Sequence, residues 1–185
     1  MDIDLNYLSG SEAKLVVGEL IDAYADIYNT PPYAGDPFFS TDAFGERLYA
    51  AFEMPGFGVL TARVDSRLVG YVHGVTLAAD RPWWVSLGTA RPSTAQVAAV
   101  RGDMFWLREL MVRSEVSNKG IGRRLHDSMI SKRRESWAIL TCVVGNEPAH
   151  GAYLRWGYKI LGEVKHAPES PVYDVMIRDP LVAVP

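Results

Sequence analysis

The spacing of hydrophobic and polar residues predicts most elements in the first part of the chain. Residues 3–8 alternate between apolar and polar side chains, which favours a half-buried strand. Ser9 or Ser11 can cap the helix that follows. In that helix, apolar residues recur at every fourth position from Val16 to Tyr28, which is the repeat of one helical face. A second helical pattern starts after Ser40 and stops before Pro55, because a proline disrupts a helix. The N-terminal part is therefore expected to form a strand and then two helices.

The middle of the chain changes from helical spacing to extended apolar runs. Residues 57–64 and 68–77 are rich in side chains that favour strands. They are separated by the polar residues 65–67, which predicts an antiparallel hairpin. Residues 78–103 contain prolines, tryptophans and glycines without a sustained repeat. We expect a long excursion there, with a short helix that begins at Ser93.

The C-terminal part is expected to alternate strands and helices. Residues 104–112 favour a strand, and the almost continuously apolar run 138–144 is typical of a strand covered on both faces. The other predicted elements are a helix at 120–135, a helix at 146–156 and a closing hairpin of 158–164 with 172–178. The resulting order is β-α-α-β-β-β-α-β-α-β-β.

The segment between the strand at 104–112 and the next helix has the features of an anion site. Gly120 and Gly122 lack a Cβ, so the backbone there can approach a ligand closely or take a positive φ angle. The first turn of a helix has amide groups without partners inside the helix, and such an end attracts phosphates. Lys119 and Arg123 add charge of the right sign. The sequence patterns of nucleotide-binding P-loops and of Rossmann turns are absent, which argues against both classes.

Two blocks of the sequence resemble the GNAT family of N-acetyltransferases. The first block is Leu110-x-Val112, followed after a short connection by x-x-Gly120-x-Gly122 at the start of a basic helix. This block is similar to motif A of the family. The family usually has Arg or Gln at the position of Ser117, so a long polar side chain is missing here while the glycine turn is kept.

The second block follows the apolar run at 138–144. In the resembled family a buried strand leads to an asparagine, then to a helix with a tyrosine, and then to a glycine and an aromatic residue. The residues in the corresponding places are Asn146, Ala149, Tyr153, Gly157 and Tyr158. Two blocks in the right order, with one helix between them, make the resemblance specific.

The resemblance implies a fold, a reaction and a co-substrate. It implies an α/β fold in which about four helices flank a central mixed sheet of six to seven strands, as a single domain over residues 1–185. It also implies direct transfer of the acetyl group of acetyl-CoA to a primary amine of a small molecule or a peptide. A non-catalytic acyl-CoA-binding module and a transferase for a longer acyl-CoA remain as alternatives.

The resemblance also assigns residues to coenzyme A. The pantetheine arm is expected to pair with the strand edge of Leu110, Met111 and Val112, where the Met111 amide donates to the thioester carbonyl. The diphosphate is expected on the amide groups of a contiguous stretch: Asn118, Lys119, Gly120, Ile121, Gly122 and Arg123. Asn146 is expected either to bind the pantetheine amide or to cap the helix that follows it.

Three residues are candidates for the proton transfers. Tyr153 stands where the family has its general acid, and a phenol with a pKa of about 10 can protonate a leaving thiolate. The alternative is an aromatic side chain packed on the inner face of its helix. Glu109 alternates with Met111 along the strand and is the candidate base, with a salt bridge to an arginine as the alternative. His73 is the rival base.

The acceptor amine is expected near the first two helices. In the resembled family that region, here residues 11–53, forms most of the acceptor pocket, and residues 78–103 are a candidate lid. The predicted acceptor-binding residues are Tyr28, Tyr33, Phe38, His73 and Trp84, with Phe39, Phe44 and Trp83 as further candidates. Aromatic residues with few carboxylates favour a partly apolar acceptor over a polycationic aminosugar.

Composition narrows the remaining possibilities. Apolar residues make up 48% of the chain and charged residues 22%, which is ordinary for a globular protein. The net charge of −3 argues against general nucleic-acid binding. Cys142 is the single cysteine and lies in an apolar run, so we expect it to be buried and without a disulfide. The histidines lack the spacing of metal ligands, so no metal is predicted.

The sequence also indicates where the protein acts. No apolar run is long enough to cross a bilayer, and the N-terminus lacks the pattern of a signal peptide. The cytoplasm is therefore the expected location. A homodimer is compatible with the sequence.

Overall fold

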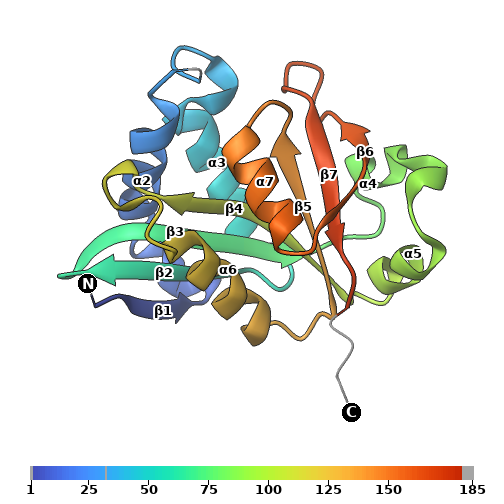
Figure 1. The fold of residues 1–185 in the computed structure, drawn as a ribbon, viewed down its shortest axis with the longest axis horizontal. Coiled ribbons are helices and arrows are strands. Elements are labelled where there is room, and N and C mark those ends of the chain that lie inside the picture. The colour runs from blue at the N-terminus through green and yellow to red at the C-terminus, as the bar shows by residue number, and fades with distance from the viewer. Residues whose placement is uncertain (1, 32, 181–185) are drawn as a thin grey trace. The chain divides into compact units, whose positions relative to one another are not determined.

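The fold is built on one mixed sheet of seven strands. The strands are β1 (Asp4–Leu8), β2 (Gly58–Val64), β3 (Arg67–Thr76), β4 (Met104–Val112), β5 (Trp137–Val143), β6 (Lys159–Val164) and β7 (Tyr173–Arg178). The structure is a computed structural model and describes residues 2–31 and 33–180. Hydrogen bonds join the strands in the order β1-β2-β3-β4-β5-β7-β6 (Figure 1). The parallel pair of β4 and β5 stands among antiparallel pairs, which confirms the predicted fold class.

Contacts between residues divide the chain into two compact units. The first unit comprises Met1–Val75 and Arg108–Lys132, and the second comprises Thr76–Leu107 and Arg133–Pro185. The single domain over residues 1–185 stays a prediction, and residues 1, 32 and 181–185 lie outside the described part of the chain.

The strands of the first unit form an antiparallel meander. Leu8 of β1 lies opposite Val59 of β2, and β2 continues into β3 through a tight turn. Asp65 and Ser66 in this turn have φ angles of 49° and 66°. Two successive left-handed residues are typical of two-residue hairpin turns. The predicted hairpin is confirmed, except that Arg67 belongs to β3 and not to the turn.

The segment predicted as the first helix contains two helices, α1 (Gly10–Lys14) and α2 (Val17–Tyr28). At the start of α1, the Glu12 carboxylate accepts hydrogen bonds from the Ser9 amide at 2.8 Å and from the Ser9 hydroxyl at 2.7 Å. Leu15 lies between the two helices and is 86% exposed. The single predicted helix is therefore broken at Leu15, just before the four-residue repeat begins at Val16.

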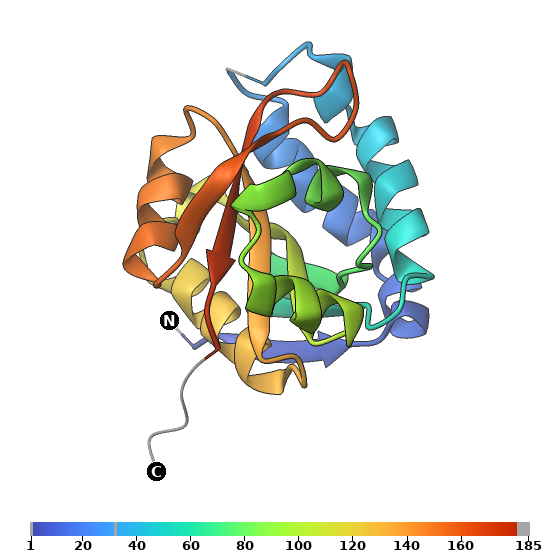
Figure 2. The same ribbon diagram turned by 90° about the vertical axis from the view of Figure 1, so that its right-hand side faces the viewer.

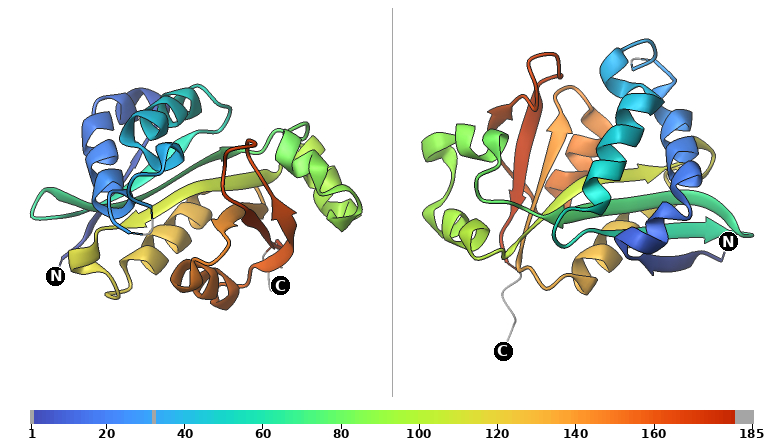
Figure 3. Two further views of the ribbon diagram at one scale, coloured as in Figure 1. Left: turned by 90° about the horizontal axis from the view of Figure 1, so that it is seen from above. Right: turned by 180° about the vertical axis from the view of Figure 1, so that it is seen from behind.

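The second predicted helix is confirmed as α3 (Thr41–Phe52), which starts after Ser40 as predicted. The Ser40 side chain accepts a hydrogen bond from the Ala43 amide at 3.2 Å. The preceding loop contains a single 3₁₀ turn, η1 (Pro37–Phe39). α3 and α2 both pack over the strands of the first unit (Figure 3).

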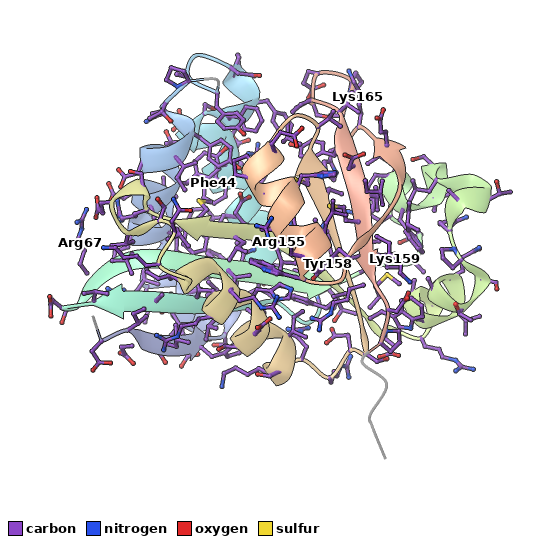
Figure 4. All side chains as sticks on the ribbon, in the orientation of Figure 1. Phe44, Arg67, Arg155, Tyr158, Lys159 and Lys165 are labelled. Atoms are coloured by element: carbon purple, nitrogen blue, oxygen red, sulfur yellow. The ribbon has the colours of Figure 1, made fainter. Side chains whose placement is uncertain are left out.

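Side chains from these helices and strands share one core in the first unit: Leu20, Tyr24, Phe44, Leu48, Val59, Leu68, Tyr71 and Met111. Phe44, labelled in Figure 4, is only 2% exposed and belongs to this core. α6 (Ile121–Lys132) covers the other face of the strands (Figure 3). There, a Cβ on Gly70 would come within 3.3 Å of the Leu125 side chain.

In the second unit, the start of β4 runs parallel to β5. The register pairs Met104–Leu107 with Trp137–Leu140, and β4 continues beyond this pairing to Val112. β7 pairs with β5 on one side and with β6 on the other. The predicted closing hairpin is therefore confirmed.

The short helix of the second block is α7 (Glu147–Arg155), as predicted. Gly157 follows it with a φ angle of 90°, so the chain reverses at the residue type that adopts this conformation most easily. Tyr158 and Lys159, labelled in Figure 4, then lead into β6.

Residues 78–103 are more ordered than the sequence pattern indicates. They form three short helices, drawn in green in Figure 2: α4 (Pro82–Ser86), η2 (Gly88–Ala90) and α5 (Ser93–Val100). The helix predicted from Ser93 is confirmed, whereas α4 was not predicted. Trp83 and Trp84 of α4 are 4% and 1% exposed, and the Trp83 ring lies 5.1 Å from that of Trp106. Buried tryptophans thus hold the excursion within the second unit.

Cys142 is buried, as predicted, and burial raises the pKa of its thiol to about 11. Within residues 2–31 and 33–180, none of the helices has the length and apolar content needed to span a bilayer. The same described residues contain no group of three or more His, Cys, Asp or Glu side chains that could hold a metal ion.

Candidate active site

The connection from β4 to α6 contains two residues with left-handed backbone conformations. η3 (Ser114–Val116) turns the chain after β4, and Asn118 and Gly120 then have φ angles of 59° and 77°. A Cβ on Gly120 would meet no heavy atom within 4 Å. The backbone conformation, and not crowding by the protein, therefore requires glycine at this position. Left-handed residues next to right-handed ones turn backbone amides into an anion-binding concavity.

α6 begins directly after this turn. The Arg124 amide donates to the Gly120 carbonyl at 3.1 Å, which closes the first helical hydrogen bond. The amides of residues 121–123 consequently have no acceptor inside the helix. Gly122 lies in this first turn, and a Cβ there would touch only the Val112 side chain, at 3.7 Å. The two glycines of the motif thus differ, because only Gly120 has a positive φ angle.

The basic side chains near the turn are on the surface. Lys119 and Arg123 are both exposed. Arg123 forms an ion pair with Asp127, one helical turn further along α6. An exposed pair of this kind contributes little to stability, so it leaves Arg123 able to change partners.

The last part of β4 lies against β3 without room for a side chain between them. A Cβ on Gly70 would be 2.6 Å from the Met111 carbonyl oxygen, which is closer than any real contact. The Arg113 amide also donates to the Val69 carbonyl at 2.9 Å. Met111 itself is 3% exposed and joins the core under α2 and α3. These contacts fix the strand end that precedes the turn.

Arg113 joins α2 to this strand end. Its side chain is only 6% exposed and forms ion pairs with Asp22 and Asp26 of α2. Its Nε also donates to the Leu68 carbonyl of β3 at 2.8 Å. One buried guanidinium therefore connects three elements at the point where the chain enters the glycine turn.

Glu109 lies two residues before Met111 on β4 and is half-buried. The Tyr28 hydroxyl of α2 donates to its Oε1 at 3.2 Å. Burial raises the pKa of the Glu109 carboxyl to about 7, although Arg47, the Tyr28 hydrogen bond and Arg108 act in the opposite direction. This carboxyl therefore changes charge near neutral pH.

His73 and Tyr71 contribute buried polar atoms to the same unit. His73 is 3% exposed, and neither of its ring nitrogens has a hydrogen-bond partner among the described residues. Burial, followed by the charge of Arg108, lowers its pKa to about 3, so the imidazole is neutral. The Tyr71 hydroxyl is also buried without a partner there. Burial and the nearby Glu109 raise the pKa of this phenol well above its usual value.

Aromatic side chains of α2, η1 and the loop between them gather next to Glu109. The Tyr28 ring lies 4.2 Å from that of Tyr24, 4.9 Å from that of Tyr33 and 5.1 Å from that of Phe39. Phe38 contacts Phe39 edge to face at 5.2 Å. Tyr28, Tyr33 and Phe38, which the sequence analysis assigned to the acceptor, are thus part of one group.

Arg47 of α3 stands beside this group. Its guanidinium lies 4.8 Å from the centre of the Phe38 ring, and Nη1 donates to the Phe38 carbonyl at 3.0 Å. Arg108, which precedes Glu109 on β4, approaches the Met54 sulfur at 3.0 Å. Both arginines are half-buried.

Tyr153 and Asn146 belong to the second unit. Tyr153 lies on α7 with 8% exposure, and its ring contacts those of Trp156 and Tyr158 at 5.5 and 5.8 Å. Asn146 is the N-cap of α7, and its side chain accepts from the Ala149 amide at 3.4 Å. The packing and capping alternatives are therefore present, while the proposed contacts of both residues with coenzyme A stay predictions.

The first unit brings most of the predicted site residues together. The strand edge of Leu110, Met111 and Val112, the turn at 118–123, and Glu109 with its neighbours all belong to it. His73 belongs to this unit as well. Trp84 belongs to the second unit, where it is fully buried under the Arg91 guanidinium at 5.4 Å.

Sequence reasoning missed four residues of the first unit: Arg47, Tyr71, Arg108 and Arg113. Arg113 stands one residue after the strand edge, which is a signal that could have singled it out. The other three lie on a helix and on two strands where nothing in the local pattern distinguishes them.

Comparisons with known proteins agree with this geometry. The model of the acetyltransferase (GNAT) family matches residues 21–158. A structure from Pyrococcus horikoshii OT3 is 20% identical, with a TM-score of 0.69, over 98% of this chain and 100% of that one. PaiA N-acetyltransferase from Thermoplasma acidophilum, in complex with coenzyme A, is 17% identical with a TM-score of 0.57, over 97% and 99%.

An acetyltransferase from Thermus thermophilus is 15% identical with a TM-score of 0.63, over 98% of each chain. At these identities the structures show a shared fold only. No curated protein sequence matches the chain at a significant level. The family match covers most of the chain, including β4, the glycine turn and α7. The chain therefore belongs to the GNAT family of acetyltransferases.

Proposed function

We propose that this protein transfers the acetyl group of acetyl-CoA directly to a primary amine of a small molecule or a peptide. The observation that carries the proposal is the placement of the Glu109 carboxyl. It is hydrogen-bonded to Tyr28 and stands on the strand that leads through Leu110–Val112 into the glycine turn. One short stretch of chain thus supplies both a candidate base and a candidate donor site.

The donor site fits coenzyme A. The turn is exposed and open above Gly120, and the amides of residues 121–123 have no helical partner. We assign the diphosphate to the amides of residues 118–123, because a helix N-terminus favours phosphate groups. We assign the pantetheine arm to the edge of Leu110, Met111 and Val112, beyond the part of β4 that pairs with β5. Asn146 is assigned to the pantetheine amide.

Glu109 suits the base better than His73 does. An amine must lose a proton as its nitrogen attacks the thioester carbonyl, and an efficient base has a pKa near the working pH. The pKa of Glu109 is about 7, whereas burial lowers that of His73 to about 3. The imidazole is therefore a weak base that remains available as a hydrogen-bond donor and acceptor.

The proposed reaction balances without a metal. The amine nitrogen forms a bond to the acetyl carbon and gives its proton to the Glu109 carboxylate. The carbon–sulfur bond then breaks, and the coenzyme A thiolate leaves with the bonding electron pair. The Tyr153 phenol protonates this thiolate and regains a proton from solvent, and the Glu109 carboxyl releases the proton of the amine to solvent. A cytoplasmic location and a homodimer stay predictions from the sequence.

A thiol-release assay tests the proposal. Purified protein with acetyl-CoA is offered a panel of amines, and free coenzyme A is measured at pH 8. We expect turnover with at least one amine, and Glu109→Gln should lower kcat/KM by about 100-fold or more. Glu163→Gln, at an exposed position of β6, is the matched control and should leave the rate unchanged.

Two outcomes would contradict the proposal. Stabilisation by coenzyme A without thiol release from any amine would favour a non-catalytic binding module. Full activity of Glu109→Gln would remove Glu109 from the mechanism. Replacing acetyl-CoA with longer acyl-CoA thioesters in the same assay decides the acyl group.

A further inference from the structure

Two arginines act on the single carboxyl of Glu109. The charged groups that lower the pKa of this carboxyl are the guanidiniums of Arg47 and Arg108, and its hydroxyl partner Tyr28 is neutral. The positive charges of Arg47 and Arg108 therefore act on a carboxyl that is about half ionised near pH 7. Once Glu109 has taken a proton from an amine, both positive charges remain.

Arg47 acts on the Glu109 carboxyl through its charge, but within the described residues it forms no ion pair at contact distance. Its contacts are the carbonyl oxygen and the ring of Phe38, and neither carries a charge. Other arginines of the first unit form ion pairs, such as Arg63 with Glu19 and Arg113 with two aspartates. The hydrogen bond to Phe38 uses one of the five N–H donors of the Arg47 guanidinium, which leaves others for a second partner.

His73 provides a second and independent sign of a missing polar partner. Both ring nitrogens are buried without a hydrogen bond among the described residues, and the ring lies near Arg108. The Tyr71 hydroxyl, close to Glu109, is likewise buried without a hydrogen-bond partner among the described residues. Buried polar groups in folded proteins nearly always have a partner, so these atoms point to polar groups of a ligand.

The neighbouring surface is aromatic. Tyr28, Tyr33, Phe38 and Phe39 contact one another, and Arg47 lies over the Phe38 ring. A ligand that fits this region has an apolar body next to its charged groups. A polyamine or an aminosugar with several ammonium groups would instead meet two guanidiniums of the same sign.

We propose that the acceptor is an amine that also carries a carboxylate, joined to an apolar body, as in a hydrophobic amino acid. Its amine meets Glu109, and its carboxylate meets the guanidinium of Arg47, with Arg108 adding positive charge. His73 and Tyr71 supply hydrogen bonds to the same ligand. This inference rests on the proposed function, because it assigns the amine to the proposed base.

Matched pairs of amines, with and without a carboxylate, test the inference. The probes are phenylalanine with phenethylamine, leucine with 3-methylbutylamine, and β-alanine with ethylamine, each with acetyl-CoA. We expect kcat/KM to favour the carboxylated member of at least one apolar pair by about tenfold or more, since charged hydrogen bonds of this kind are strong. Phenylalaninamide, which keeps the amine and the ring, should behave like phenethylamine.

Arginine variants sharpen the test. Arg47→Gln should reduce the preference for the carboxylated member by about tenfold, chiefly through KM, and Arg108→Gln should reduce it less. Arg108 also acts on Glu109, so its replacement can change the rate with both members of a pair. The quantity compared is therefore the ratio of kcat/KM for the carboxylated member to that for the uncharged member, in which an effect on the base cancels. Arg101→Gln, at the exposed end of α5, is the control and should leave the ratio unchanged.

The outcomes separate this inference from the proposed function. Turnover of the uncharged members at equal or higher kcat/KM would overturn the inference and leave the acetyltransferase proposal in place. The same conclusion would follow if both Arg47→Gln and Arg108→Gln kept the wild-type ratio. The absence of thiol release with every amine would overturn the proposed function, and this inference with it.

Discussion

The glycine turn and the cluster around Glu109 lie in the same unit but are built by opposite means. The turn presents main-chain amides, and two residues with positive φ angles, Asn118 and Gly120, set its shape. The cluster presents side chains that come from α2, α3, β3 and β4. A main-chain site can be specified by a few neighbouring residues, whereas a side-chain site depends on how distant segments pack. A main-chain site suits the diphosphate, which all acyl-CoA donors share. A side-chain site suits the acceptor, which differs between proteins.

The largest expected effect concerns the side-chain site and its pH dependence. Because Glu109 must be ionised to accept a proton, kcat/KM should rise with pH and level off above its pKa of about 7. In Glu109→Gln that inflection should vanish, and the rate at pH 8 should fall by about 100-fold or more. Steady-state kcat/KM, measured from about pH 5.5 to about pH 9 for both proteins, tests this expectation. An unchanged inflection in the variant would assign it to another group.

The connection between the two regions is tested by Arg113. Arg113→Gln removes a buried guanidinium that contacts Asp22, Asp26 and the Leu68 carbonyl. We expect the free energy of unfolding to fall by about 2–3 kcal/mol, because a buried carbonyl loses its donor. Urea denaturation measures this. Arg63→Gln, which removes a more exposed pair with Glu19, should cost less than about 1 kcal/mol. Equal losses in both variants would show that the buried contacts of Arg113 contribute no more to stability than an exposed ion pair does.

The side-chain site should also lower stability at high pH. A carboxyl whose pKa is raised from its ordinary 4.5 to about 7 binds its proton more tightly in the folded state. The protonated carboxyl therefore contributes to the free energy of unfolding below the pKa that Glu109 has in the unfolded chain. This contribution is lost as the pH rises through 7. Glu109→Gln should stabilise the protein at pH 8, relative to its effect at pH 5, by about 1–3 kcal/mol. Urea denaturation at both pH values measures the difference, and a pH-independent effect would contradict the assigned pKa.

The smallest expected effect concerns the hydroxyl that orients Glu109. The hydrogen bond from Tyr28 lowers the pKa of the carboxyl, so Tyr28→Phe should shift the inflection in kcat/KM to higher pH. The rate at pH 7 should fall by about threefold. Tyr49→Phe, at a position that is 51% exposed, is the control. A shift to lower pH would show that the hydroxyl acts in another way.

The same contrast explains what the sequence could predict. The turn was predictable because two glycines after a strand and before an amphipathic helix permit a positive φ angle and a close approach of the backbone to a ligand. The strands and the hairpin at Asp65 and Ser66 were predictable from alternation and turn residues. The break between α1 and α2 at Leu15 was not, because the four-residue repeat begins only at Val16 and says nothing of the residues before it. α4 was not either, because a five-residue helix is too short to show a repeat.

The side-chain site was predictable only in part. Glu109 and His73 stood out because their side chains are uncommon in apolar strands. Arg47 did not, since it looks like an ordinary helix-surface residue until α3 packs next to Phe38 and β4. The shift of the Glu109 pKa arises from burial by distant segments, and no local pattern encodes it.

The central claim is that main-chain amides, and not side chains, hold the diphosphate of coenzyme A. Titration calorimetry of coenzyme A with Gly120→Val and Lys119→Gln tests it most directly. Valine tolerates a φ angle of 77° poorly, so the first variant should weaken binding by about 100-fold while its thermal midpoint shows that the fold persists. Removal of the exposed Lys119 charge should weaken binding by only about threefold. Wild-type affinity in Gly120→Val, or an equal loss in Lys119→Gln, would contradict the account.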